Sequence, residues 1–361
     1  MNQILITGDQ PLGRGGMSTI IRTVSLHLKE KNALAGLFFD ARSLDGIVDT
    51  TWLEDLPLFP TGDKTAKIIR KQAYIFRLIK LLKQNPDIRK IVCLTPNHCR
   101  LAYLATKFVS RKIEIISWIH FSVDTYKQRE KRNLIRSCNY HLVISSGIRE
   151  QLVELGAQAE SCFVVYNSVS RKTETIERPK IEFSILYLGR IEFFRLKNLK
   201  ELFSSVEGLS IPWHLHIVGS GSNEDLAQCR NYAQKIGIDG SITWHGWQSR
   251  PWDYIRDVIQ KISCCVLSSK REGFAIVLTE AMSYGIPCVS SDCPTGPRDI
   301  IQNGVNGYLY QNTAHADENL RQALLKLYKS QAAFNPEKIK ASITKFYSEN
   351  YLARLDKILL S

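Results

Sequence analysis

Two glutamates eight residues apart, Glu272 and Glu280, offer the clearest chemistry in the sequence. The apolar run 264–269 predicts a strand, the loop behind it holds Glu272, and a short helix ending at Gly285 holds Glu280. This spacing does not favour a close carboxylate dyad and suits a polyhydroxylated ligand whose hydroxyls donate to both side chains. Backbone N–H groups at the helix start would face a phosphate of that ligand; they belong to Ile276, Val277 and Leu278. Taken singly, each glutamate is more simply an ordinary helix-end or surface residue.

Two cations seven residues apart, Arg190 and Lys197, follow the predicted strand 184–189. A planar guanidinium and a compact ammonium that share a strand-end loop can converge on a diphosphate. Surface charge is the simpler explanation for either cation alone. The pair therefore gains meaning only beside the other motifs.

A glycine-rich loop, GDQPLGRGGMS, follows the first predicted strand and contains Gly15 and Gly16. Glycines let backbone N–H groups approach a ligand, and the helix that begins behind them favours an anion. The Rossmann spacing GxGxxG and the Walker A lysine are both absent, which argues against a nicotinamide or P-loop site. By itself the loop is equally well a flexible turn.

Short apolar or β-branched runs alternate with amphipathic segments along the chain, which predicts an α/β fold with parallel sheets. The predicted strands are 3–8, 90–95, 114–119, 141–145, 162–167, 184–189, 214–219, 264–269 and 287–292. The polar stretch 168–179 suits a linker. We therefore predict two Rossmann-like, doubly wound domains facing across a cleft, residues 1–172 and 173–344, with a C-terminal helix near 345–361 packed on the first. Ligands of such sheets bind at the carboxyl ends of the strands.

With 361 residues, 44% of them hydrophobic and 23% charged, the chain has the composition of an ordinary folded protein. We expect neither a membrane span nor a cleaved signal, because no apolar run approaches the roughly 18 residues of a spanning helix. The nine cysteines are odd in number and never spaced as CxxC, which argues against a disulfide framework and favours a reducing compartment. Because no metal-ligand motif is present, we expect no metal and no cofactor.

A formal net charge of +13 requires an anionic partner such as phosphate, nucleic acid or a membrane surface. Residues 1–170 carry +9 of this charge, from 24 Lys and Arg against 15 Asp and Glu. Signatures of nucleic-acid-binding proteins are absent, so nucleic-acid binding is a weak alternative.

Segment 64–83 holds seven Lys and Arg and no acidic residue, which predicts a basic amphipathic helix. Its apolar stripe consists of Ile68, Ile75, Leu78, Ile79 and Leu82. This stripe more simply packs on the sheet, while the basic face remains available to anionic lipid. A second basic cluster follows His120 and consists of Lys127, Arg129, Lys131, Arg132 and Arg136. We expect this cluster to hold a phosphorylated acceptor.

Together, the three loops and the stretch AMSYGIPCVSSDCPTGPRDII resemble the retaining nucleotide-sugar glycosyltransferases of family 4. The resemblance covers nearly the whole chain and implies the GT-B fold of that family. Fragments such as SWIHFSVD, HLVISSGI and HGWQSRPW are most similar to the branch that performs α-1,6-galactosyl transfer from UDP-galactose to the bacterial lipopolysaccharide core. This similarity implies that the acceptor is a sugar of that core. Together with the two basic segments and the cysteine usage, it leads us to expect a cytoplasmic enzyme, peripheral on the inner face of the inner membrane.

The resemblance also assigns roles to the two glutamates. It makes Glu280 the partner of the nucleotide ribose hydroxyls, and Glu272, with the backbone of Gly273 and Phe274, the clamp on the donor sugar. The family often has proline after this phenylalanine, whereas the present chain has Ala275.

The remaining roles fall to the other two loops and to one histidine. Arg190 and Lys197 become the diphosphate pair. From the other domain, Gly15 and Gly16 would close on the phosphates, and His120 would sit beside the donor sugar and the reaction centre.

Transfer breaks the bond between the sugar and a nucleoside diphosphate, whose growing charge the two cations and a helix N-terminus would stabilise without a metal ion. Because the resemblance engages both glutamates with hydroxyls, we expect a same-face displacement without a glycosyl-enzyme intermediate. UDP-glucose, UDP-N-acetylglucosamine or a GDP-sugar, with another cell-surface glycan as acceptor, stay open as alternatives. So does a sugar-nucleotide enzyme of the same architecture that epimerises or hydrolyses.

Overall fold

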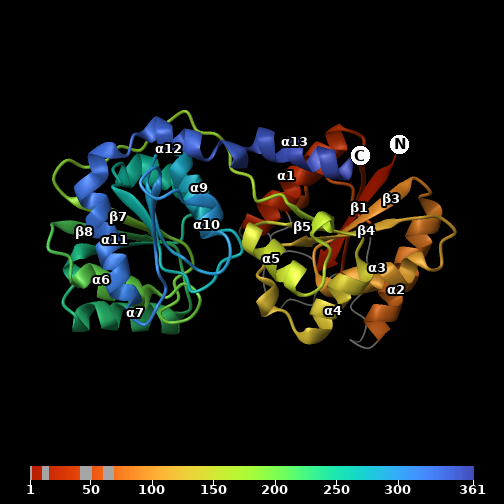
Figure 1. Cartoon of the computed structure of the whole chain (residues 1–361), viewed down its shortest axis with the longest axis horizontal. Coiled ribbons are helices and arrows are strands. Elements are labelled where there is room, and N and C mark those ends of the chain that lie inside the picture. The colour runs from red at the N-terminus through yellow and green to blue at the C-terminus, as the bar shows by residue number, and fades with distance from the viewer. Residues whose placement is uncertain (1, 10–15, 41–50, 60–68) are drawn as a thin grey trace. The chain divides into compact units, whose positions relative to one another are not determined.

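The computed structural model describes residues 2–9, 16–40, 51–59 and 69–361, and the chain divides into two compact units. Unit 1 consists of Met1–Asn167 and Glu349–Ser361, and unit 2 of Ser168–Ser348. The division after residue 167 lies five residues before the predicted one after 172. Each unit is built around its own six-stranded sheet surrounded by helices (Figure 1).

Unit 1 contains a wholly parallel sheet in the order β2-β1-β3-β4-β5-β6. Its strands are β1 (Gln3–Asp9), β2 (Leu34–Asp40), β3 (Ile88–Cys93), β4 (Glu114–Ile119), β5 (Tyr140–Val143) and β6 (Cys162–Val164). Its α-helices are α1 (Gly16–Glu30), α2 (Ile69–Gln84), α3 (Pro96–Thr106), α4 (Gln128–Ser137), α5 (Ser146–Glu154) and, at the C-terminal end, α13 (Ser348–Leu359). The central strands are apolar on both faces because helices cover both sides of such a sheet.

The end of α13 is anchored within unit 1 by a buried lysine of β3. Lys90 donates from Nζ to the backbone carbonyls of Leu359 at 2.9 Å and Ser361 at 2.8 Å. The last carbonyls of a helix have no partner inside the helix, and the negative end of its dipole attracts a cation. On the same helix, Asp356 lies 2.8 Å from Nε2 of His27 and 3.1 Å from Nζ of Lys31. These contacts attach the last residues to unit 1.

The basic helix predicted over 64–83 is α2 from Ile69 onward; the residues before it, including Ile68, lie outside the described ones. Leu78 and Leu82 are fully buried, so the apolar stripe packs inside unit 1, where α2 contacts α3. Its exposed residues include Lys71, Phe76, Lys80 and Lys83. Within the described ranges, no helix has the length and apolar character needed to cross a membrane.

Unit 2 contains a second parallel sheet, in the order β12-β11-β10-β7-β8-β9. Its strands are β7 (Phe183–Leu188), β8 (Trp213–Val218), β9 (Ile242–Gly246), β10 (Cys264–Leu267), β11 (Cys288–Ser291) and β12 (Gly307–Tyr310). Its α-helices are α6 (Leu199–Glu207), α7 (Asn223–Lys235), α8 (Pro251–Tyr254), α9 (Ile276–Ser283), α10 (Pro297–Ile300), α11 (Ala316–Ser330) and α12 (Pro336–Ser342). A π-helical turn, Ile255–Ile259, continues α8.

The strand order of unit 2 reverses between β7 and β10. From β7 the chain runs outward through β8 and β9, returns to the other side of β7 as β10, and continues through β11 to β12. In open α/β sheets, ligands bind outside the carboxyl ends of the strands at such a reversal. The loops that follow β7 and β10 are therefore the place to look for a site.

A buried histidine in the core of unit 1 makes stability depend on pH. His141 on β5 is buried, and its Nδ1 lies 2.7 Å from the hydroxyl oxygen of Ser117 on β4. Burial lowers the pKa of His141 from 6.5 to about 4. Between these two pH values the unfolded chain binds a proton that the folded protein does not. The free energy of unfolding therefore falls as the pH falls through this range.

The substitution His141→Gln should remove this part of the pH dependence. Between neutral pH and about pH 4, we expect the variant to lose roughly 2 to 3 kcal/mol less unfolding free energy than the wild type. Urea unfolding at several pH values measures the difference. His315→Gln, at an exposed position of unit 2, is the matched control and should keep the wild-type slope. Equal slopes for His141→Gln and the wild type would contradict the assignment.

Candidate active site

The two loops at the strand reversal of unit 2 meet in an ion pair. Lys197, in the loop after β7, places its Nζ 2.6 Å from Oε1 of Glu272, in the loop after β10. The lysine side chain is 27% exposed and the glutamate side chain 11% exposed, so both charges are largely withdrawn from water. The predicted diphosphate cation and the predicted sugar-binding carboxylate thus lie in direct contact.

Three hydrogen bonds to backbone carbonyls hold these two loops together beside the ion pair. The hydroxyl of Ser268 donates to the carbonyl of Lys197 at 3.0 Å. The backbone N–H of Lys270 donates to the carbonyl of Leu196 at 2.8 Å, and its ammonium to the carbonyl of Phe194 at 2.8 Å. The bonded residues lie in the loops after β7 and β10, the two strands at the reversal. These hydrogen bonds therefore fix the position of Lys197 relative to β10.

Arg190, the other predicted cation, extends from the same loop into solvent. Its side chain is 73% exposed, and Nη1 lies 3.4 Å from Oε1 of Glu192. Glu192 is buried and also accepts the backbone N–H of Lys197 at 3.2 Å. This carboxylate links both ends of the loop, and the sequence analysis did not select it. Its position as the one acidic residue among the cations of RIEFFRLK was the available signal.

The start of α9 presents backbone N–H groups at the end of the Glu272 loop. Ala275 precedes the helix in the left-handed region, with φ 70°, and no side chain caps the helix start. Proline cannot adopt this φ, so the turn excludes the proline that is common in the family, although the left-handed φ also strains alanine. The N–H of Leu278 donates to the carbonyl of Ala275 at 3.0 Å. The N–H of Leu278 thus already has a partner at the helix start, and we propose Ile276 and Val277 as the donors to a phosphate.

The segment after β11 supports the Glu272 loop from behind. The hydroxyl of Thr295 donates to the backbone carbonyl of Glu272. Gly296 has φ 95°, and a Cβ atom there would lie 2.7 Å from the backbone of Phe274. The ring of Phe274 is buried, 5.2 Å from that of Phe346. Gly273 and Phe274 are therefore held in place by close packing.

Glu280 lies on α9 and has a different partner from Glu272. Its Oε2 accepts a hydrogen bond of 3.0 Å from the indole N–H of Trp252 on α8. The side chain is half-buried, and burial raises the pKa of this carboxyl group. Trp252 stacks on the ring of Tyr284 with centroids 5.3 Å apart. Trp252 ends the fragment HGWQSRPW, for which the sequence predicts no role beyond family similarity.

The predicted residues of unit 1 are partly described. Gly15 lies outside the described residues, and Gly16 is the exposed first residue of α1. His120 follows β4, is 7% exposed, and its ring lies 4.8 Å from that of Trp118. Burial lowers the pKa of His120 to about 4, so its ring is neutral at physiological pH. Its buried Nε2 has no hydrogen-bond partner in the part of the chain that the structure describes.

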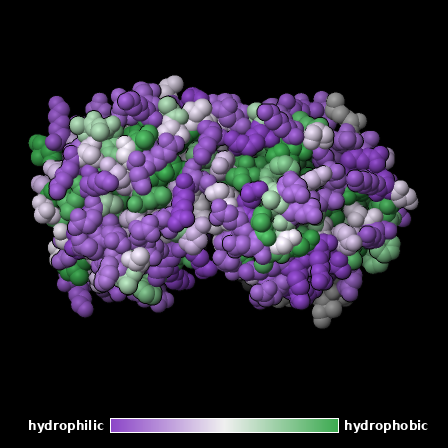
Figure 2. Space-filling model, viewed as in Figure 1, coloured by the Kyte–Doolittle hydropathy of each residue, from purple (hydrophilic) through white to green (hydrophobic). Residues whose placement is uncertain are grey.

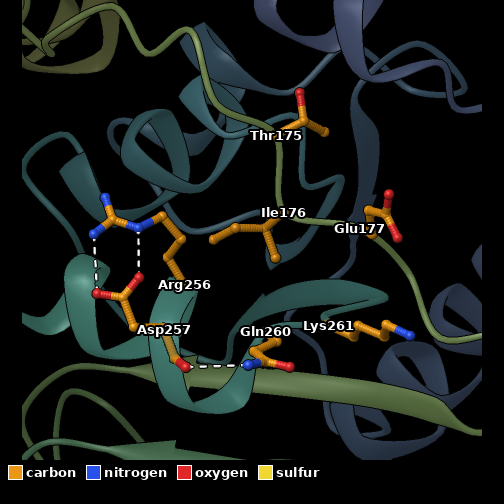
Figure 3. A pocket seen from close by; sticks show the side chains of 7 residues that line it. All are labelled: Thr175, Ile176, Glu177, Arg256, Asp257, Gln260 and Lys261. Atoms are coloured by element: carbon orange, nitrogen blue, oxygen red, sulfur yellow. Dashed lines mark hydrogen bonds and ion pairs between the residues drawn. The ribbon is translucent and has the colours of Figure 1, made fainter.

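Outside these loops, the described residues form an open pocket but no metal site. Among the described residues, no three His, Cys, Asp or Glu side chains gather into a possible metal site. An open pocket of about 480 Å³ in unit 2 is bordered by the seven residues of Figure 3, Thr175, Ile176, Glu177, Arg256, Asp257, Gln260 and Lys261. None of the residues expected to bind a donor lines it.

Known proteins are similar to this chain in both sequence and architecture. The family model of group 1 glycosyl transferases matches residues 170–345. The lipopolysaccharide 1,6-galactosyltransferase of Escherichia coli K12 is 35% identical over 99% of this chain and 98% of its own length. The chain belongs to the group 1 glycosyltransferases. The Salmonella typhimurium LT2 enzyme of the same name is 34% identical over 99% of both chains.

Solved structures show that this glycosyltransferase has the GT-B fold. The apo form of the lipopolysaccharide outer core galactosyltransferase WaaB is similar with a TM-score of 0.90 and 32% identity, over 99% of both chains. The UDP complex of Anabaena HepE matches with a TM-score of 0.80 over 99% of both chains, but at 16% identity it supports the fold alone. The predicted architecture of two parallel-sheet α/β units is therefore confirmed.

Removing one member of the ion pair should cost stability that removing both partly restores. Lys197→Met leaves a largely buried carboxylate without its cation, and we expect a loss of about 1 to 3 kcal/mol in unfolding free energy. Adding Glu272→Gln should recover part of that loss. Urea unfolding of the wild type, both single variants and the double variant measures the coupling. Additive single effects would contradict the pairing.

Proposed function

We propose that this glycosyltransferase moves a hexose, galactose from UDP-galactose, onto a sugar of the bacterial lipopolysaccharide core. The observation that carries the proposal is the group formed by Lys197, Glu272 and the start of α9 at the strand reversal of unit 2. It combines a cation and backbone N–H groups for a diphosphate with a carboxylate for hydroxyls. Two galactosyltransferases similar over the whole chain support the choice of sugar and acceptor.

The cations of unit 2 act on the leaving group. As the bond from the anomeric carbon to the β-phosphate oxygen breaks, negative charge grows on UDP. Lys197 and the N–H groups that start α9 stabilise this charge, because cations and oriented dipoles withdrawn from water act strongly. The exposed Arg190 adds a second positive charge. Neutralisation by these groups gives a reaction that needs no metal ion.

The two glutamates bind hydroxyls and form no covalent bond to the sugar. Glu272 holds the donor sugar and Glu280 the ribose, so neither carboxylate is free to attack the anomeric carbon as in retaining glycosidases. The acceptor oxygen instead bonds to that carbon on the face that UDP leaves. The departing β-phosphate oxygen takes the acceptor's proton, and the configuration is retained.

His120 positions the donor sugar. Its imidazole is neutral and has an unpaired buried nitrogen, which can form one hydrogen bond with a sugar hydroxyl. The low pKa of His120 keeps the ring from becoming a cation near the oxocarbenium-like centre. Gly15 and Gly16 stay the residues predicted to offer backbone N–H groups to the phosphates.

Transfer onto truncated core lipopolysaccharide tests the proposal directly. UDP-galactose, UDP-glucose, UDP-N-acetylglucosamine and GDP-sugars are offered in turn, with and without acceptor, and products are identified by mass spectrometry. We expect a product one hexose larger only with UDP-galactose and acceptor. Transfer from another donor would overturn the sugar assignment. Free or epimerised sugar, formed equally without acceptor, would overturn transferase activity.

Arg190→Gln should lower the transfer rate about tenfold or more, because a charged hydrogen bond to the leaving group is lost. Stability should change little, since Arg190 is 73% exposed and Glu192 keeps the backbone N–H of Lys197 as a partner. Arg195→Gln is the matched control: it lies in the same loop, is 68% exposed, and pairs with Asp225 at 2.6 Å. Equal rates for Arg190→Gln and the control would contradict the role of Arg190.

We further propose that the enzyme meets its acceptor at the inner face of the inner membrane through cations of unit 1. Residues Lys127, Arg129, Arg132 and Arg136 on and beside α4 are exposed, and Figure 2 shows strongly hydrophilic residues over this end of the unit. Lys131 instead lies 3.8 Å from Asp124. Phe121, 54% exposed, lies in the segment before this cluster. Each cation near an anionic surface adds roughly 1 kcal/mol to binding.

Sedimentation with phosphatidylglycerol vesicles measures this attraction. We expect most of the protein to sediment at low salt and progressively less as added salt shortens the Debye length. Replacing Arg129, Arg132 and Arg136 together by Gln should weaken sedimentation. Binding that does not change with salt would contradict electrostatic docking.

A further inference from the structure

We propose that Trp252 is a positioning residue for the nucleotide: its indole N–H holds one oxygen of the Glu280 carboxylate and leaves the other directed to the ribose hydroxyls. The inference rests on the proposed function, which gives Glu280 the ribose. It assigns a role to a residue that no motif in the sequence analysis had selected.

The hydrogen bond from Trp252 fixes one oxygen of the Glu280 carboxylate. The distance from Nε1 of Trp252 to Oε2 of Glu280 is 3.0 Å. Among the described residues, Trp252 is the one that donates a hydrogen bond to the Glu280 carboxylate. An indole N–H can only donate, and a carboxylate can only accept, so the contact has one polarity. It binds one oxygen and leaves the lone pairs of Oε1 for hydroxyl donors.

Stacking sets the plane of the indole and therefore the direction of its N–H. The rings of Trp252 and Tyr284 are 22° from parallel, with centroids 5.3 Å apart. Tyr284 is buried, and its backbone carbonyl accepts the N–H of Ile176 at 3.0 Å. A rotation of the indole would break its stacking on Tyr284. The indole N–H therefore points at Glu280 before any nucleotide binds.

The short helix that carries Trp252 is held at several points. Tyr254 places its hydroxyl 3.1 Å from Nδ1 of His245 on β9. In the π-helical turn that follows, Arg256 lies 2.7 Å from Asp257 and 3.4 Å from Asp253 (Figure 3 shows the pair with Asp257). Single π-helical turns occur often at functional sites. The contact with His245 ties α8 to the sheet, and the two ion pairs hold α8 to the turn that follows it, so that Trp252 can orient a carboxylate on α9.

The charge state of Glu280 depends on the same neighbours. Burial raises the pKa of this carboxyl group, while the Trp252 N–H and the positive charge of Lys172 lower it. Lys172 lies over the ring of Tyr284, 5.6 Å from its centroid. Without the indole N–H, Glu280 would take up a proton at a higher pH than in the wild type. A protonated carboxyl is a poorer acceptor for ribose hydroxyls.

Calorimetric titration of the full-length Trp252→Phe variant with UDP and with 2′,3′-dideoxy-UDP tests the role. Phenylalanine keeps an aromatic ring for Tyr284 and removes the donor. We expect UDP to bind about tenfold more weakly than to the wild type and dideoxy-UDP to bind almost equally. The loss for UDP should grow as the pH is lowered and shrink as it is raised. A purely structural defect would weaken both nucleotides at every pH.

Trp244→Phe is the matched control, because this tryptophan of β9 packs edge-on against Phe203 of α6. It should leave the ratio of the two affinities unchanged. If Trp252→Phe does not fold, benzothienylalanine at position 252 keeps the shape of the indole without its N–H and should give the same result.

The possible outcomes separate the inference from the function on which it rests. The wild type could bind UDP more tightly than dideoxy-UDP, and Trp252→Phe could show the same ratio of the two affinities at every pH. This result would overturn the inference alone. A wild type that binds both nucleotides equally would remove the ribose from Glu280 and overturn both assignments.

Discussion

The ion pair between Lys197 and Glu272 is the interaction on which the proposed site depends. It joins two loops 75 residues apart in sequence, and it lies where the strand order of unit 2 reverses. Charges this far withdrawn from water are stable only with a partner. A diphosphate that takes the ammonium as its partner leaves the carboxylate for sugar hydroxyls. One pair of side chains can therefore serve both ends of the bond that breaks.

The two glutamates have the same carboxylate chemistry, but different neighbours give them different proposed roles. Glu272 is fixed by a cation from the adjacent loop, and Glu280 by the neutral N–H of Trp252. Each side chain thus has one oxygen held by the protein. The short helix α9 joins them, with its uncapped start between. A nucleotide sugar has its groups in the matching order, hydroxyls, phosphates and hydroxyls.

The sequence was sufficient to predict the α/β fold, most strands and the helix end at Gly285, which has φ 77°. The strands that it missed, β2, β9 and β12, all lie at sheet edges, and each contains a glycine, a residue that is rare in strands: Gly36, Gly246 and Gly307. The predicted linker 168–179 belongs to unit 2, with Ile176 buried. Contact between Lys197 and Glu272 depends on which strands are adjacent, and no local spacing encodes that order.

A crystal structure of the enzyme with UDP tests the central claim most directly. We predict that the diphosphate lies within hydrogen-bond distance of Nζ of Lys197 and of the N–H groups of Ile276 and Val277, with Glu280 on the ribose. A nucleotide bound elsewhere, with Lys197 and Glu272 still paired and no phosphate beside them, would contradict the account.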